Sequence, residues 1–126
     1  MAETPKGTVE KFWQTMNTND FGAAGRLLAD DYRLEWPQSG EVIRGPDNFA
    51  RVNRNYPANG PWRFSVQRLV AEGGEVVSDV GVTDGVVKAR AITFSTVEGG
   101  LIVRQIEFWP DPYDAPKWRR AWVERA

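Results

Sequence analysis

Three charged residues, Asp79, Arg90 and Glu107, are spaced so that they could form one catalytic row across a β-sheet. Asp84-Gly85 separates two runs rich in β-branched residues, and this dipeptide favours a two-residue type I′ turn with positive φ at both positions. Such a turn places Asp79 directly opposite Arg90. A second two-residue turn at Glu98-Gly99 would place Arg90 opposite Glu107. We therefore predict a row of carboxylate, guanidinium and carboxylate on three neighbouring strands.

The chemistry of this row depends on the face of the sheet that it occupies. Inside a pocket, one guanidinium cannot neutralise two carboxylates, so burial and like charge should raise the pKa of one acid while Arg90 lowers that of the other. Two acids with separated pKa values suit general acid–base catalysis. We expect Arg90 to hold Asp79, and Glu107 to be the acid–base group of this catalytic trio. On a solvent-facing surface, the same row would be a structural charge ladder.

Composition narrows the remaining chemistry. The 126 residues include neither His nor Cys, which excludes imidazole bases, thiolate nucleophiles, disulfides and His or Cys metal sites. No glycine-rich phosphate loop is present, so we expect neither a cofactor nor a metal. The net charge of −1 arises from scattered residues of both signs, which argues against nucleic acid as a partner. Without a signal-peptide core or a membrane-length apolar run, we expect no membrane partner and a cytoplasmic location.

The elements that must position the row follow from hydrophobic periodicity. Thr4-Pro5 predicts the start of a helix, because a hydroxyl N-cap followed by Pro suits the first turn, and apolar residues then recur at helical spacing up to Met16. The other expected elements are a short helix from residue 20, a helix over 45–56, and strands over 32–36, 41–44, 62–70, 74–83, 86–97 and 101–110. This order predicts an α+β fold in which helices cover one face of a strongly curved, mixed or antiparallel sheet.

A sheet that curls around helices encloses a conical space, and apolar side chains around that space would make a pocket for a small apolar substrate or ligand. In this pocket Asn53 and Tyr56 would orient a carbonyl or hydroxyl group. The alternative is a cone packed solid by its own aromatic residues. The predicted substrate-binding residues are Phe12, Met16, Trp36, Phe49, Asn53, Tyr56, Phe94, Gln105 and Trp109.

The outer face of the sheet and the end of the chain suggest contacts with a second subunit. If the charged row points inward, the outer face is broadly apolar, and such a surface on a small domain suggests homodimerisation. Its expected residues are Val80, Val82, Ala89, Ala91, Ile106 and Phe108. Residues 111–126 form a Pro- and Trp-rich tail, in which Trp118 and Trp122 would clamp the sheet or a partner subunit. The alternative role of this tail is a lid over the pocket.

Several segments resemble the nuclear transport factor 2-like superfamily, and within it the polyketide-cyclase-like (SnoaL-like) branch. The segments are Ala29-Asp30-Asp31-Tyr32, Trp36 to Glu41, Ile43-Arg44-Gly45, Gly100 to Val103 and, for one branch of that group, Asp111 to Arg119. The resemblance spans nearly the whole chain. It implies one domain over residues 1–126, a cystatin-like cone and dimerisation through the outer sheet face. It also assigns the row at residues 79, 90 and 107 to the concave face.

The resemblance narrows the expected activity. In ketosteroid isomerases, three polar catalytic residues would align with Phe12, Trp36 and Ile92, which are apolar here. The Arg and Asp of limonene epoxide hydrolases would align near Val80 and Val82. The acidic residue that cyclase-like members carry on the last strand corresponds to Glu107. We therefore predict a cofactor-independent cyclase-, isomerase- or hydratase-type enzyme with Glu107 as its acid–base group. The alternative is a non-catalytic ligand-binding or dimerisation module with a structural row.

Overall fold

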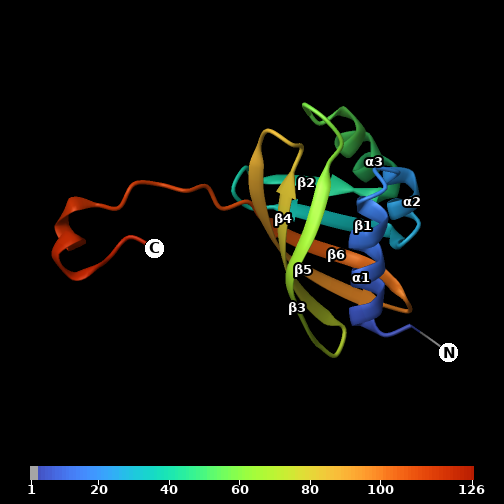
Figure 1. Ribbon diagram of the computed structural model, residues 1–126. Helices are drawn as coiled ribbons and strands as arrows, with labels where there is room; N and C mark the ends of the chain where they lie inside the picture. Colours follow the sequence, from blue (N-terminus) through green and yellow to red (C-terminus); the bar gives the residue numbers. More distant parts are fainter. Residues whose placement is uncertain (1–2) are drawn as a thin grey trace.

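The computed structural model describes residues 3–126 as a curved six-stranded sheet with helices packed on one face (Figure 1). This arrangement confirms the predicted α+β fold. In chain order the elements are α1 (Pro5–Met16), α2 (Phe21–Gly25), β1 (Leu28–Trp36), β2 (Glu41–Arg44), α3 (Gly45–Asn55), β3 (Arg63–Glu72), β4 (Glu75–Thr83), β5 (Lys88–Glu98), β6 (Leu101–Phe108) and the 3₁₀-helix η1 (Lys117–Trp122).

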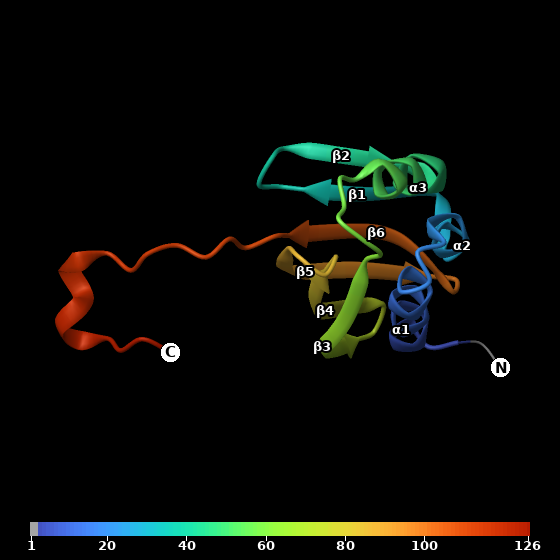
Figure 2. The same ribbon diagram turned by 45° about the horizontal axis from the view of Figure 1, so that its top comes forward.

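The sheet is mixed and has the strand order β2-β1-β6-β5-β4-β3. β1 and β6 run parallel, and every other neighbouring pair is antiparallel. Figure 2 shows that α1 lies against the β3–β6 part of the sheet, while α3 lies beside β1 and β2. The helices therefore leave one side of the sheet uncovered. We call the two sides the helix-covered face and the open face.

Helix α1 begins as the sequence indicates. The Oγ1 atom of Thr4 accepts a hydrogen bond of 3.0 Å from the backbone N–H of Gly7, and Pro5 occupies the first turn. The helix buries the face that carries Val9, Phe12 and Met16. Each such side chain stabilises the fold by about 1.5–3 kcal/mol when fully buried. The packing of this face fixes one wall of the space between helices and sheet.

The hairpin between β4 and β5 differs from the prediction. Gly85 has a positive φ of 95°, whereas Asp84 does not adopt positive φ, and the loop spans residues 84–87 between the paired Thr83 and Lys88. Asp84 accepts hydrogen bonds from the backbone N–H groups of Val86 and Val87, at 3.0 and 2.8 Å. These bonds favour an Asx-type loop over a two-residue turn. The predicted register is therefore wrong by two residues.

This register difference has little effect on the pairing of Asp79 with Arg90. Asp79 lies opposite Ile92, and Arg90 lies opposite Gly81. A shift of two residues keeps a side chain on the same face of its sheet. Asp79 and Arg90 therefore still share one face, as predicted, although they are diagonal rather than direct neighbours.

The hairpin between β5 and β6 changes the prediction more. Its turn residues are Gly99 and Gly100, both with positive φ, rather than Glu98-Gly99. A bulge between Thr96 and Val97 then shifts the pairing by one more position. Together the two differences place Thr93, not Arg90, opposite Glu107. A net odd shift moves a side chain to the other face, so the predicted single row of Asp79, Arg90 and Glu107 is wrong.

The two faces are thereby reassigned. Ser78, Thr93 and Glu107 form one row on the helix-covered face, where Ser78 accepts a hydrogen bond of 3.1 Å from the indole of Trp13 on α1. Asp79 and Arg90 lie on the open face. The predicted outer apolar set is also split by the register: Val80, Val82, Ala89 and Ala91 lie on the helix-covered side, and only Ile106 and Phe108 lie on the open face.

Residues after Pro110 leave the sheet as an extended arm, which Figures 1 and 2 both show projecting away from the helices and strands. Within the described chain, no hydrogen bond joins residues 111–126 to the rest of the molecule. Trp118 and Trp122 lie in η1 and are 72% and 79% exposed. The arm thus clamps neither its own sheet nor its own pocket. No helix within residues 3–126 is long and apolar enough to cross a membrane.

Candidate active site

The helix-covered face holds one buried carboxylate, that of Glu107 on β6. The residue is only 7% exposed, and both of its oxygens accept hydrogen bonds. Oε2 accepts from the hydroxyl of Thr93 on β5 at 2.6 Å, and Oε1 accepts from the indole N–H of Trp36 at 3.0 Å. Trp36 is the last residue of β1, the parallel neighbour of β6, so the sheet order places both donors beside the acid. The two bonds fix the carboxylate at one position in the cone.

Burial raises the pKa of Glu107 above its ordinary value, while the hydrogen bonds from Thr93 and Trp36, and the nearby Trp109 side chain, act in the opposite direction. Within the described chain, Glu107 forms no ion pair. A buried acid without a cation is held closer to neutrality than an exposed one, because desolvation penalises its ionised form. This environment brings the carboxyl group toward the range in which it could donate or accept a proton at neutral pH.

A second polar group lies deeper on the same face. The Tyr32 hydroxyl donates to Oε1 of Gln105 at 2.5 Å, and Nε2 of Gln105 donates to the hydroxyl of Ser95 at 3.0 Å. Burial, and secondly the charge of Glu107, raises the pKa of Tyr32 well above its ordinary value. Tyr32 is therefore neutral, and its proton orients Gln105 beside the acid.

Of these groups, Trp36, Gln105 and Glu107 line a cavity of about 130 Å³. Eight of the nine predicted substrate-binding residues line it, from Phe12 to Trp109. The exception is Phe94, which is 43% exposed on the open face and packs edge to face on Phe108. Its placement inside the cone is wrong, because it shares the parity of Asp79 and Arg90. The lining residues are Phe12, Trp13, Met16, Leu34, Trp36, Phe49, Asn53, Tyr56, Trp62, Phe64, Val82, Val87, Ala89, Gln105, Glu107 and Trp109.

Sequence reasoning missed several walls of the cavity. Trp62 and Phe64 alternate along the edge strand region and signal an inward face, but only the fold shows that this face reaches the same cavity. Two backbone clamps hold the region in place: Asn17 pairs with the backbone N–H and C=O of Phe64, and Asn19 does the same for Trp62. These long-range contacts between the end of α1 and β3 could not be read from local pattern.

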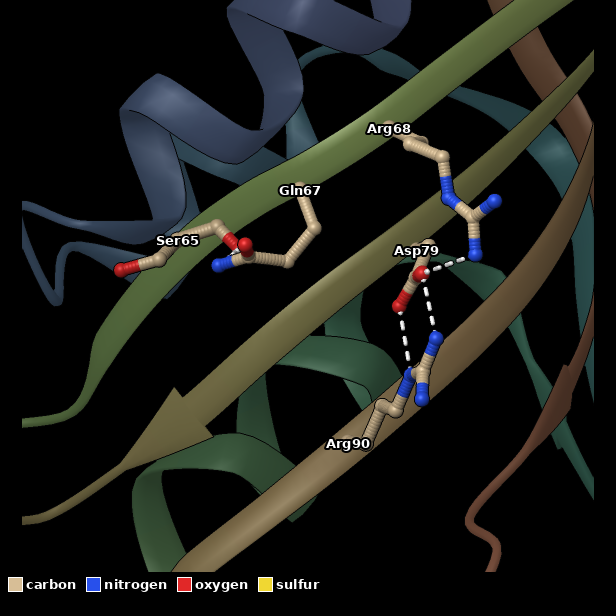
Figure 3. A network of polar contacts seen from close by, with 5 residues as sticks. All are labelled: Ser65, Gln67, Arg68, Asp79 and Arg90. Carbon is tan, nitrogen blue, oxygen red and sulfur yellow. Dashed lines mark hydrogen bonds and ion pairs between the residues drawn. The ribbon is translucent and has the colours of Figure 1, made fainter. Parts of the chain in front are cut away.

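Asp79 does not reach the cavity, and its predicted catalytic position beside Glu107 is wrong. Its carboxylate lies on the open face, where Arg90 donates two hydrogen bonds, of 2.7 and 2.6 Å, and Arg68 donates one of 3.3 Å (Figure 3). The Arg90 guanidinium, and to a lesser extent Arg68, holds the pKa of Asp79 below its ordinary value. Ser65 and Gln67 lie on the same face beside the pair in Figure 3. The arrangement matches the alternative that the sequence left open, a charge ladder on the sheet surface.

The part of the chain that the structure describes contains no group of three or more acidic side chains arranged to hold a metal ion. The polar groups in the cavity lining are the Glu107 carboxyl group, the amides of Asn53 and Gln105, the Tyr56 hydroxyl and the indole N–H groups of the Trp walls.

The curved sheet with helices on one face agrees with what the family comparison finds. The SnoaL-like domain model matches residues 9–105. The chain belongs to the SnoaL-like family. Among solved structures, a protein from Kribbella flavida DSM 17836, provisionally identified as a ketosteroid isomerase, is 34% identical, with a TM-score of 0.88 over 97% of this chain and 89% of that one. An NTF-2 like protein of unknown function from Burkholderia xenovorans LB400 is 26% identical, with a TM-score of 0.79 over 97% and 94%.

A more distant structure shows the fold alone. This protein from Catenulispora acidiphila DSM 44928, with a ketosteroid isomerase-like fold, was solved in complex with trimethylamine; it is 15% identical, with a TM-score of 0.68 over 83% of this chain and 85% of that one. Proteins of this fold thus include one that holds a small ligand. Among curated proteins, none matches this sequence.

Proposed function

We propose that this SnoaL-like protein is a cofactor-independent enzyme of the cyclase, isomerase or hydratase type, in which Glu107 is the acid–base group. The observation that carries the proposal is a buried carboxyl group, oriented by Trp36 and Thr93, in an aromatic cavity without a cationic partner. General acid–base catalysis is most efficient when the pKa of the group lies near the working pH, and burial of Glu107 moves its pKa in that direction.

The substrate part that reacts must be small and largely apolar. A cavity of about 130 Å³ is close in size to engineered cavities of about 150 Å³ that bind benzene. A larger substrate would place only its reacting end beside Glu107 and extend outward past Tyr56 and Val87, which are both at least half exposed. Glu107 is buried among the aromatic walls, and low exposure to water strengthens the electrostatic effect of its carboxylate.

The proposal is tested by hydrogen exchange rather than by a guessed reaction. A panel of small ketones and lactones is incubated with the protein in deuterium oxide, and loss of the proton next to the carbonyl is followed by NMR. We expect exchange in at least one compound and a drop of about 100- to 10,000-fold in Glu107→Gln. Equal exchange rates for the wild type and Glu107→Gln, for every compound exchanged, would contradict catalysis by this residue.

One observation favours the non-catalytic alternative, a ligand-binding module. Enolisation needs a donor that stabilises the developing oxyanion, and each cavity amide already donates one N–H bond to the protein. Gln105 bonds Tyr32 and Ser95, while Nδ2 of Asn53 donates to the carbonyl of Phe49 at 2.9 Å. A protein that binds a ligand tightly but exchanges no proton would identify this alternative.

We also propose that the chain forms a homodimer through the open face of the sheet. No helix within the described chain covers this face, and Val70 and Phe94 on it are 67% and 43% exposed. Ile106 and Phe108 are half-buried beside them. Replacing Phe94 by Asp should shift the mass in light scattering from dimer to monomer while leaving the circular dichroism spectrum intact. A monomeric wild type would contradict this interface.

The arm is proposed as a further part of this dimer contact. Its exposed Trp118 and Trp122 find no partner surface on their own subunit among the described residues. The two most similar structures named above align over 97% of this chain, which leaves only about four of its residues unaligned and supports the arm as a shared feature. Truncation after Pro110 should raise the dissociation constant of the dimer, measured by sedimentation. An unchanged constant would exclude the arm from the contact.

A further inference from the structure

The charge of the cavity points to a ligand class. Among the described residues that line it, Glu107 is the single charged side chain, and no Lys or Arg is present. Half of the lining is aromatic: Phe12, Trp13, Trp36, Phe49, Tyr56, Trp62, Phe64 and Trp109. We propose that this cavity binds a small organic cation, a quaternary or protonated alkylamine, between its aromatic walls and the Glu107 carboxylate. The inference rests on the proposed function, because it places the ligand in the same site.

The hydrogen bonds of Glu107 favour a cationic ligand over a neutral one. The indole of Trp36 is a donor only, so Oε1 is held as an acceptor, and the Thr93 hydroxyl lies 2.6 Å from Oε2. Both bonds strengthen when the carboxylate is ionised. Yet no cation on the described chain compensates that charge, and a buried carboxylate needs one to remain ionised. A ligand that brings its own positive charge completes the site.

The walls suit an alkylated ammonium group. The negative faces of aromatic rings attract cations, most strongly those of Trp, and three Trp rings line this cavity besides the Trp13 indole bonded to Ser78. Alkyl groups lower the cost of removing the cation from water and pack on apolar surface, whereas a bare metal ion would find too few oxygens here. A trimethylammonium-sized group is compatible with a cavity of about 130 Å³.

One wall is positioned before the ligand arrives. Gln38, in the turn between β1 and β2, accepts a hydrogen bond from the backbone N–H of Trp109 and donates one of 3.0 Å to its carbonyl. This two-bond clamp ties the end of β6 to the β1–β2 turn. A preformed wall reduces the ordering that a ligand must impose on the site.

Ligand binding should be linked to pH. A cation next to Glu107 stabilises its ionised form, so the affinity for a permanent cation should rise as the pH rises through the pKa of Glu107 in the free protein and then level off. The other titratable groups that face this region are Tyr56, at the end of α3, and Tyr32 on β1, which contacts Gln105. Burial and the charge of Glu107 raise the pKa of Tyr32 well above its ordinary value of about 10, so Tyr32 produces no change between about pH 5 and 8.

The test compares choline with its neutral isostere 3,3-dimethyl-1-butanol, in which carbon replaces nitrogen. Calorimetric titrations are made at several pH values on the full chain. We expect choline to bind at least about tenfold more tightly than the isostere at neutral pH, and this preference to vanish in Glu107→Gln. Asp79→Asn, on the open face, serves as the matched carboxylate control and should keep the preference. Retained binding of the isostere by Glu107→Gln would show that the variant still forms the cavity.

Two results would overturn the inference. Equal or tighter binding of the neutral isostere means that the cavity selects shape rather than charge, and binding of neither compound means that no alkylammonium site exists. If choline fails while proton exchange still depends on Glu107, the acid–base proposal stands without the cation. If choline binds in the expected way but no exchange occurs in any compound, the cation inference stands and the enzymatic proposal fails.

Discussion

The two faces of the sheet each carry a carboxylate of about 7% exposure, and the two are treated in opposite ways. Asp79 on the open face is paired with Arg90 and Arg68, which hold its pKa below the ordinary value. Glu107 on the helix-covered face has only neutral donors, and burial raises its pKa. Low exposure of a carboxylate therefore says little about function. The presence of a cationic partner distinguishes the two carboxylates, because a paired acid is fixed in its charged form while an unpaired one stays available for proton transfer or for a ligand.

The largest expected difference between the two acids is in catalysis. Once a compound that the protein turns over is identified, Glu107→Gln should lower kcat/KM by about 100- to 10,000-fold, since an amide cannot transfer the proton. Asp79→Asn should change it by less than about twofold, because this residue lies on the far side of the sheet. Steady-state kinetics on both variants measure the contrast. A comparable loss in both would return Asp79 to the catalytic machinery.

A smaller effect is expected from the donor that orients Glu107. Trp36→Phe removes the N–H bonded to Oε1 but keeps an aromatic wall. Loss of one hydrogen bond to an ionised group should raise the pKa of Glu107 further and lower the rate roughly tenfold. The acidic limb of the pH–rate profile should move to higher pH. Trp62→Phe is the control, since Trp62 lines the cavity without bonding to Glu107 in the hydrogen-bond network described above. Equal shifts in both variants would mean that packing, not the hydrogen bond, sets the pKa.

The two acids should also oppose each other in the pH dependence of stability. The folded pKa of Asp79 is lowered, so its contribution is complete above the unfolded pKa of about 3.9 and is lost as the pH falls through the folded value. The folded pKa of Glu107 is raised, so its ionisation destabilises the protein above that pKa, and this penalty disappears as the pH falls toward the unfolded value of about 4.3.

Urea denaturation between about pH 2 and 7 covers both titrations and separates these contributions. Asp79→Asn should lose stability at neutral pH and show less loss on acidification than the wild type. Glu107→Gln should lack the penalty at neutral pH, so its unfolding free energy should fall more steeply on acidification than that of the wild type. Parallel curves for both variants would contradict the difference between the faces.

The sequence predicted only part of this contrast between Asp79 and Glu107, because the faces of the two residues depend on the hairpin turns between them. Helix α1 and the inward alternation of Tyr32, Leu34 and Trp36 follow from local periodicity, while the position of Glu107 in the cone was implied by the family resemblance. The face that Asp79 and Arg90 occupy relative to Glu107 did not follow from local periodicity, because this depends on the register of both hairpins. In the first, Asp84 accepts hydrogen bonds from Asn59, 25 residues away in sequence, besides its own loop. Such a long-range contact leaves no local signal.

The second hairpin shows why one residue matters. Both Gly99 and Gly100 can adopt positive φ. Composition alone therefore did not distinguish a turn at Glu98-Gly99 from one at Gly99-Gly100. The bulge beside Thr96 has no marker in the sequence. The Asp79–Arg90 contact was nevertheless predicted correctly, because a long Arg side chain reaches a diagonal neighbour as well as a direct one. Contacts between long side chains thus survive a register error of two residues, which keeps both on one face, but not an odd shift, which separates them.

The smallest expected effect distinguishes the two arginines of the open face. Arg90 makes two short bonds to Asp79, whereas Arg68 makes one of 3.3 Å from a side chain that is 75% exposed. Arg90→Ala should therefore raise the pKa of Asp79 more than Arg68→Ala does, since solvent and salt screen the exposed pair more strongly. NMR titration of the Asp79 carboxyl carbon measures both shifts. Neither substitution should move the pKa of Glu107 on the other face, and a shift there would mean that the sheet does not separate the two acids electrostatically.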